Sequence, residues 1–93
     1  MDRDFYLVSY DIADDKRRLK VAHLLEGWGE RVQYSVFEVW VTQEEMADLM
    51  EKLAPHVDEA GSIRIYRLCA ICQAGREVLG EGTPTEAPDL HIV

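Results

Sequence analysis

An aspartate at the end of an apolar run is the residue of this chain best suited to do chemistry. Asp11 follows the segment 5–10, which is almost wholly apolar and aromatic. A carboxylate beside apolar residues needs water, a hydrogen-bond donor or a cation to offset its desolvation. Taken alone, an aspartate at the end of a strand is more often a turn or helix-capping residue than a metal ligand. On these residues both interpretations stay open.

A second chemical feature is a cluster of positive charge just after this aspartate. Four of the ten basic residues lie within five positions, and with Arg31 they are candidates for phosphate contacts: Lys16, Arg17, Arg18 and Lys20. Guanidinium groups suit this role because they bind phosphate oxygens in bidentate fashion. A run of charges on a helix is nevertheless more often only a solvated face. The formal net charge of -8 opposes nucleic-acid binding on average, so such binding requires a local positive patch.

The hydrophobic pattern predicts the elements that position these side chains. The segment 5–12 is typical of a strand with two apolar faces, and positions 14–28 follow helical spacing after an acidic first turn. The region 31–41 alternates as a strand does. It is either one long kinked strand or two strands that meet near Tyr34 and Ser35.

The second half of the chain repeats this order. Thr42 and Glu45 have the spacing of a capping box, an apolar helical pattern runs on to Pro55, and positions 63–70 alternate as another strand. The order predicts an α+β, ferredoxin-like βαββαβ sandwich, with two helices on one face of an antiparallel sheet. The short segments 76–79 and 90–93 are candidates for additional edge strands.

A chain of 93 residues is long enough for one core, so we expect a single domain over residues 1–93, with residues 74–93 as a C-terminal extension that helps dimerisation. A homodimer is favoured because pairing lets a small domain bury more apolar area. The sequence has no apolar run of membrane-spanning length and no pattern of a secretion signal, so we expect a cytoplasmic protein without membrane attachment.

The two cysteines form a single Cys-x-x-Cys pair at Cys69 and Cys72. Without a second pair this spacing is a weak signal for zinc or redox chemistry. On the predicted strand the two thiols would point to opposite faces. A tetrahedral zinc site would require a dimer to bring two such pairs together.

Three blocks of the sequence together resemble the CRISPR-associated endoribonucleases, the second core CRISPR-associated protein family. The blocks are Val8-Ser-Tyr-Asp-Ile12, Arg31-Val-Gln-Tyr-Ser-Val-Phe-Glu38 and Ser62-Ile-Arg-Ile-Tyr-Arg-Leu68. The resemblance implies a ferredoxin-like homodimer in which Asp11 binds Mg²⁺ near the two-fold axis. One departure is that Gly61 stands where many members carry an acidic residue.

The resemblance also implies a function. Members of the family are the dimeric scaffold that holds prespacer DNA between integrase dimers during spacer acquisition. We therefore expect a homodimer that binds duplex DNA, docks a CRISPR integrase subunit and carries Mg²⁺-dependent endonuclease activity, with single-stranded RNA as a further candidate ligand. The alternatives are a metal-dependent endoribonuclease with no scaffold role and a ferredoxin-like regulatory module without a nucleic-acid partner.

The matched blocks extend the candidate catalytic site beyond Asp11. Two Asp11 carboxylates related by dimer symmetry would share one Mg²⁺, whose bound water would attack a phosphodiester. Tyr10 and Phe37 join the site in this interpretation, as residues that stack on bases or line the cleft. An aromatic residue in a strand is more often part of the core or of an interface.

Overall fold

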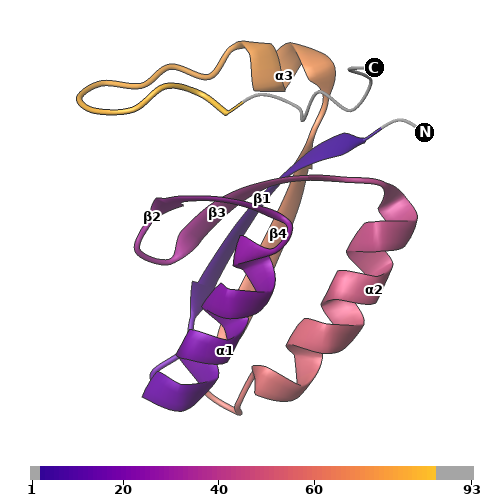
Figure 1. The fold of residues 1–93 in the computed structure, drawn as a ribbon, viewed down its shortest axis with the longest axis vertical. Coiled ribbons are helices and arrows are strands. Elements are labelled where there is room, and N and C mark those ends of the chain that lie inside the picture. Colours follow the sequence, from indigo (N-terminus) through magenta and orange to yellow (C-terminus); the bar gives the residue numbers. More distant parts are fainter. Residues whose placement is uncertain (1–2, 86–93) are drawn as a thin grey trace.

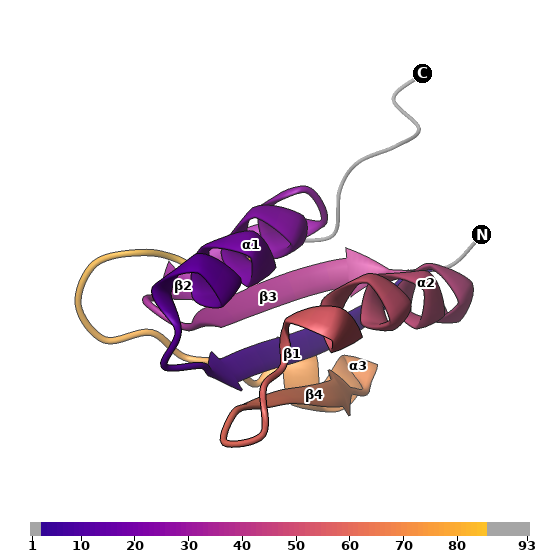
Figure 2. The ribbon, with the colours of Figure 1, turned by 90° about the horizontal axis from the view of Figure 1, so that it is seen from below.

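The structure is a computed structural model that describes residues 3–85 of the chain. The chain forms, in order, β1 (Asp4–Asp11), α1 (Asp15–Glu26), β2 (Gly29–Gln33), β3 (Val36–Val41), α2 (Gln43–Leu53), the 3-10 helix η1 (Ala54–His56), β4 (Ser62–Leu68) and α3 (Ala70–Ala74). The four strands make one antiparallel sheet in the order β2-β3-β1-β4, and α1 and α2 lie on the same side of it (Figures 1 and 2). The predicted α+β, βαββαβ fold is confirmed. Within residues 3–85, no helix is long and apolar enough to cross a membrane.

The core lies between this sheet and its two helices. Alternation along β1 turns Tyr6, Val8 and Tyr10 toward the helices, where they pack with buried side chains of β3, α1 and α2. The other β1 side chains face the side of the sheet that α1 and α2 leave open, called here the helix-free face. Apolar side chains therefore lie on both faces of β1, as its sequence predicts.

The region 31–41 contains two strands rather than one kinked strand. The turn at Tyr34 and Ser35 joins β2 to β3, and a register shift between Arg31 and Gln33 marks a bulge in β2. Gly29 starts β2 at a very close approach of the backbones: a Cβ there would lie 2.3 Å from the Glu38 carbonyl oxygen. The strand pairing therefore requires glycine at this position.

Both long helices begin with capping residues, of which the sequence predicts only the capping box of α2. The Asp14 carboxylate accepts a hydrogen bond of 2.9 Å from the Arg17 amide, which makes Asp14 the N-cap of α1. In α2, Thr42 and Glu45 form the reciprocal capping box, with bonds of 3.0 and 2.9 Å. α1 ends at Glu26, two residues before the predicted boundary.

The C-terminal part of the described chain differs from expectation. β4 ends at Leu68, and the next residues form the short helix α3 instead of continuing the strand. Segment 76–79 pairs with no strand in residues 3–85, and segment 90–93 lies outside the described residues. Segment 76–79 was expected to add an edge strand. Instead, an ion pair and hydrogen bonds, described below, hold Arg76 against the helix-free face.

Candidate nucleic-acid interface

Asp11 is the last residue of β1, and its side chain is exposed. The register pairs it with Ser62 of β4, and strand alternation places it on the helix-free face with Leu7 and Ser9. No group of three or more His, Cys, Asp or Glu side chains able to hold a metal ion occurs within residues 3–85. One chain therefore presents one accessible carboxylate at this end of the sheet.

The loop before β4 accounts for the departure at Gly61. A Cβ on Gly61 would lie 2.7 Å from Asp58 Oδ1 and 3.1 Å from the Asp11 carbonyl oxygen, with Ile12 next to it. Asp58 Oδ1 is buried and has no hydrogen-bond partner in the described chain. The space that a side chain at position 61 would fill is thus partly taken by the Asp58 carboxylate, so an acidic residue at position 61 would meet both steric and electrostatic opposition.

Two of the predicted basic residues meet at the β2–β3 turn, although they belong to different elements. The guanidinium carbon of Arg18 lies 5.9 Å from the centre of the Tyr34 ring, and that of Arg31 lies 5.3 Å from it. Arg31 also donates to the Tyr34 carbonyl oxygen, from Nε at 3.0 Å and from Nη2 at 2.7 Å. The fold therefore joins the start of α1 and the β2–β3 turn into one cationic cluster, defined by Arg18, Arg31 and Tyr34 and called here the Tyr34 cluster.

The Tyr34 cluster lies next to the end of β1. Arg18 donates to the Ile12 carbonyl oxygen at 2.9 Å and forms an ion pair with Asp15. The bond to Asp15 is the main reason why the pKa of the Arg18 guanidinium is raised. Arg18 therefore ties the start of α1 to the residues that directly follow Asp11, while Asp15 offsets its charge.

Tyr34 is a component of this cluster that the sequence does not single out. Its side chain is 69% exposed, whereas the tyrosines of β1 are buried. The only signal in the sequence is an aromatic residue in the matched block at the point where the strand region breaks. An exposed ring beside two arginines becomes recognisable only when the turn is placed against α1.

The other predicted phosphate contacts, Lys16, Arg17 and Lys20, are exposed on α1. Arg17 donates from Nη1 to the Pro55 carbonyl oxygen at 3.1 Å, which ties α1 to η1. These three residues extend the positive charge of α1 but make no described contact with the Tyr34 cluster.

Tyr10 and Phe37 do not join Asp11 on the helix-free face. Both side chains point to the helix-covered side, where Phe37 is fully buried and Tyr10 is 4% exposed. The Tyr10 hydroxyl donates to the Tyr34 carbonyl oxygen at 3.3 Å, so this residue helps to fix the β2–β3 turn. The structure gives Phe37 a packing role and leaves its ring inaccessible to a base.

The two cysteines lie at the start of α3, not on a strand. Cys69 is the N-cap residue and Cys72 follows in the helix, so the expectation that they point to opposite faces of a strand is wrong. Both are exposed. The Cys72 amide lowers the pKa of the Cys69 thiol, and the hydrogen bond with Cys69 raises the pKa of Cys72.

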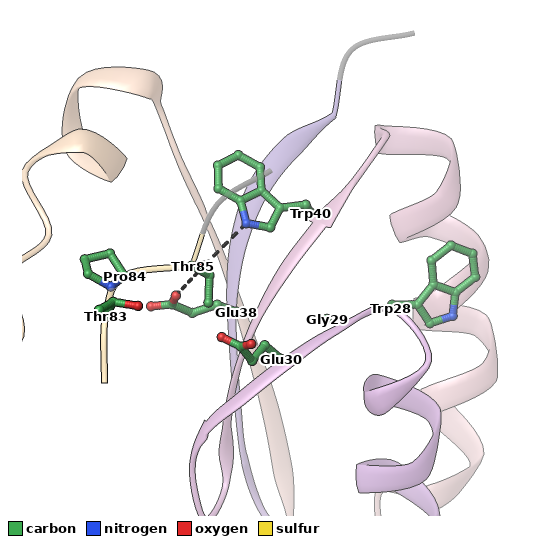
Figure 3. A pocket seen from close by; sticks show the side chains of 8 residues that line it. All are labelled: Trp28, Gly29, Glu30, Glu38, Trp40, Thr83, Pro84 and Thr85. Carbon is green, nitrogen blue, oxygen red and sulfur yellow. Dashed lines mark hydrogen bonds between the residues drawn. The ribbon is translucent and has the colours of Figure 1, made fainter. Parts of the chain in front are cut away.

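The opposite end of β1 holds a second cluster, the Arg76 cluster, defined by Arg76, Glu38, Thr85 and Phe5. Arg76 Nη1 lies 2.7 Å from Glu38 Oε1, Nη2 donates to the Thr85 carbonyl oxygen at 2.6 Å, and the guanidinium lies 4.4 Å from the Phe5 ring centre. Beside it, Trp40 Nε1 is 3.4 Å from the Thr85 hydroxyl, at an open pocket of about 450 Å³ (Figure 3). This cluster fixes the C-terminal segment on the helix-free face.

Comparison with known proteins gives a consistent result. The family model described as "CRISPR associated protein Cas2" matches residues 4–75. A CRISPR-associated endoribonuclease Cas2 of Chloroflexus aurantiacus is 49% identical over 92 residues, covering 96% of this chain and 99% of that protein.

Two solved structures are similar to this chain in both fold and sequence. The crystal structure of Streptococcus pyogenes Cas2 has a TM-score of 0.72 at 40% identity and covers 82% of this chain and 99% of that one. A chain of a partial Cas6-RT-Cas1–Cas2 complex has a TM-score of 0.70 at 33% identity and covers 82% of this chain and 90% of that one. The chain therefore belongs to the Cas2 family of CRISPR-associated proteins.

Proposed function

We propose that this Cas2-family protein is a homodimeric scaffold of CRISPR spacer acquisition, which binds prespacer DNA and docks a Cas1 integrase. Mg²⁺-dependent phosphodiester cleavage at Asp11 is a second activity of the same dimer. The observation that carries the proposal is the position of Asp11, which is exposed on the helix-free face and precedes Ile12, the residue whose carbonyl oxygen Arg18 of the Tyr34 cluster binds.

The helix-free face has the character of a dimer interface. It contains an open pocket of about 800 Å³, lined by the apolar side chains of Leu7, Val32, Val36, Val78 and Leu79 and by the charged side chains of Glu30, Arg31, Glu38, Glu77 and Glu81. Leu79 is 97% exposed. Tyr66, which belongs to β4 and points to the helix-free face, is 50% exposed. Exposed apolar side chains that gather on one face are typical of protein–protein contacts. Pairing through this face would cover them and bring the two Asp11 residues toward a common axis.

The donor set at Asp11 fits Mg²⁺ only in such a dimer. Carboxylate oxygens are ligands that Mg²⁺ accepts, and the ion commonly keeps several waters and takes one or two carboxylates. One chain offers one carboxylate, and two-fold symmetry would supply the second. Bound there, the ion would supply Lewis-acid stabilisation of charge on a phosphate oxygen. The protein's own part is to present the carboxylates and hold the substrate.

Holding the substrate falls to the basic residues at this end of the sheet. Arg31, which has no ion pair and a free Nη1 within residues 3–85, would bind a phosphate at this end of the sheet, and the exposed lysines of α1 extend the positive surface. This local positive charge allows nucleic-acid binding in spite of the formal net charge of -8. Cas1 is proposed as the partner because a similar chain forms part of a Cas1–Cas2 complex.

The test separates the scaffold from the nuclease. Wild-type protein and Asp11→Asn are compared for dimerisation by analytical ultracentrifugation, for duplex binding, and for cleavage of DNA and RNA with Mg²⁺ or with EDTA. We expect Asp11→Asn to dimerise and bind duplex DNA as wild type does and to lose metal-dependent cleavage. A monomeric wild-type protein, or one that binds no nucleic acid, would contradict the proposal. Cleavage of RNA without duplex binding would favour the endoribonuclease alternative.

A further inference from the structure

We propose that the Tyr34 ring is a stacking platform for an unpaired base of a single-stranded nucleic acid. The inference rests on the proposed function, because it assumes that this surface binds nucleic acid. It adds a residue and the group that this residue contacts: the free face of a nucleobase, together with the phosphate next to it.

The first support is that the ring is exposed while its backbone is fixed. The Tyr34 carbonyl oxygen accepts hydrogen bonds from two nitrogens of Arg31 and from the Tyr10 hydroxyl, at 2.7 to 3.3 Å. The ring itself is 69% exposed. Binding a base to an aromatic side chain on a rigid turn sacrifices little conformational freedom, and every base has a π face to offer.

The second support is the charge beside the ring. Arg18 and Arg31 both lie over the ring within 6 Å of its centre, the range of cation–π contacts, so a base would stack on the ring surface that the two guanidinium groups leave exposed. Arg31 uses Nε and Nη2 for its bonds to Tyr34 and Tyr10, whereas its Nη1 makes no hydrogen bond within residues 3–85. That nitrogen can donate to a phosphate oxygen next to a stacked base.

The third step concerns the choice between single strand and duplex. Inside a duplex both faces of each base are covered by neighbouring bases, so an external ring can stack only on an unpaired or terminal base. Phosphates alone would make no distinction between the two forms. A contribution from Tyr34 should therefore appear with single strands and be absent from a duplex without free ends.

The experiment uses three probes of one 12-nucleotide sequence with a central 2-aminopurine: single-stranded DNA, single-stranded RNA, and a DNA duplex closed at both ends by non-nucleotide linkers. The proteins are wild type, Tyr34→Ala, Tyr34→Phe and Tyr34→Leu. Leu19→Ala is the matched control, since Leu19 is 57% exposed on α1 and lies outside the Tyr34 cluster. Dissociation constants and 2-aminopurine quenching are measured, and thermal unfolding reports the folding of each variant.

We expect Tyr34→Ala to weaken single-strand binding about tenfold and to abolish the quenching. Tyr34→Phe and Leu19→Ala should stay within about twofold of wild type, as should every variant on the closed duplex. Equal effects on DNA and RNA would show that only the base is read, and a difference would assign a contact to the sugar as well. Should Tyr34→Ala unfold, Tyr34→Leu carries the same prediction.

Three results would overturn the inference. The first is unchanged single-strand binding by the alanine and leucine variants. The second is an equal loss on single strand and closed duplex, which would mean that the ring only positions the arginines. The third is a wild-type protein that binds the duplex and ignores single strands, which would leave the proposed scaffold intact. A wild type that binds neither form removes the proposed function and the inference together.

Discussion

The chain places an arginine against an aromatic ring at both ends of β1, and the partners of Arg76 differ from those of Arg31. Arg18, the other arginine of the Tyr34 cluster, is paired with Asp15 and stands outside this comparison. In the Arg76 cluster the guanidinium is 4.4 Å from the Phe5 ring centre, and its side chain is only 14% exposed. In the Tyr34 cluster Arg31 lies 5.3 Å from the ring centre and is exposed. An arginine beside an aromatic ring therefore occurs in a buried and in an open setting.

The decisive difference is the charge of the partners. Glu38 neutralises Arg76, and Gln73 and Thr85 accept its other hydrogen bonds. Arg31 donates only to the neutral carbonyl of Tyr34 and the hydroxyl of Tyr10, and it makes no ion pair among the described residues. An arginine whose charge is paired and whose nitrogens are all hydrogen-bonded acts within the fold, because its loss would leave the partner carboxylate unpaired. An arginine without an ion pair and with one nitrogen free is available to an anion.

The largest expected effect tests the structural role of the Arg76 cluster. Replacing Arg76 by Ala leaves the Glu38 carboxylate, 15% exposed, without its cation. We expect a loss of about 3 kcal/mol in the free energy of unfolding, measured with urea. The double variant Arg76→Met/Glu38→Met should recover most of this loss, because it leaves no uncompensated charge. A loss below about 1 kcal/mol in the free energy of unfolding of Arg76→Ala would contradict a structural role for Arg76.

A smaller effect is expected where the β2–β3 backbone approaches most closely. Gly29→Ala would bring a Cβ against the backbone at Glu38 and Val39, at 2.3 to 2.9 Å. We expect a destabilisation of about 2 kcal/mol, because the edge strand must shift to relieve the overlap. Gly27→Ala is the control, since the nearest atom to its Cβ would be 3.5 Å away. Equal stability of the two variants would mean that β2 adapts freely.

Stability should respond least to changes in the Tyr34 cluster. Arg31→Gln removes an exposed cation with neutral partners, so we expect a change in unfolding free energy below about 1 kcal/mol. A loss as large as that of Arg76→Ala, measured in the same urea titration, would erase the distinction between the two clusters.

The smallest expected effect is a difference in reactivity between the two cysteine thiols, which lie near the Arg76 end of the sheet. The lowered pKa of Cys69 and the raised pKa of Cys72 imply that Cys69 holds more thiolate at neutral pH. Iodoacetamide followed by peptide mass spectrometry should modify Cys69 first. The preference should shrink as pH rises past the usual thiol pKa, because both thiols then ionise. Faster modification of Cys72 would contradict the assigned order.

The sequence predicts most of the fold and part of the site. The strand at β1, both long helices, the cap of α2 and the position of Asp11 follow from local patterns, since alternation, helical spacing and capping spacing are properties of neighbouring residues. The split of 31–41 into two strands has no turn residue to mark it. It depends on the backbone approach at Gly29 and on the bond of 3.1 Å from the Tyr10 amide to the Ser35 carbonyl oxygen.

What the sequence misses are contacts between distant segments. Arg18 and Arg31 are each predicted as phosphate ligands, but their meeting at Tyr34 depends on the packing of α1 against the β2–β3 turn. The partnership of Arg76 with Glu38 spans 38 positions and has no periodic signal. Phe37 shows the opposite error, because membership of a matched block suggests a site residue while its position on the helix-covered face makes it core.

The most direct test of the account is the salt dependence of DNA binding. Arg18→Gln/Arg31→Gln removes two charges from the Tyr34 cluster, and Arg3→Gln/Arg67→Gln removes two ion-paired charges at the other end of β1. Because Asp15 already offsets the charge of Arg18, we expect the first pair to make the slope of log binding constant against log salt concentration shallower by about one for each subunit in contact with DNA, with the second pair close to wild type. Equal slopes for the two double variants would contradict the assignment of phosphate binding to the Asp11 end of the sheet.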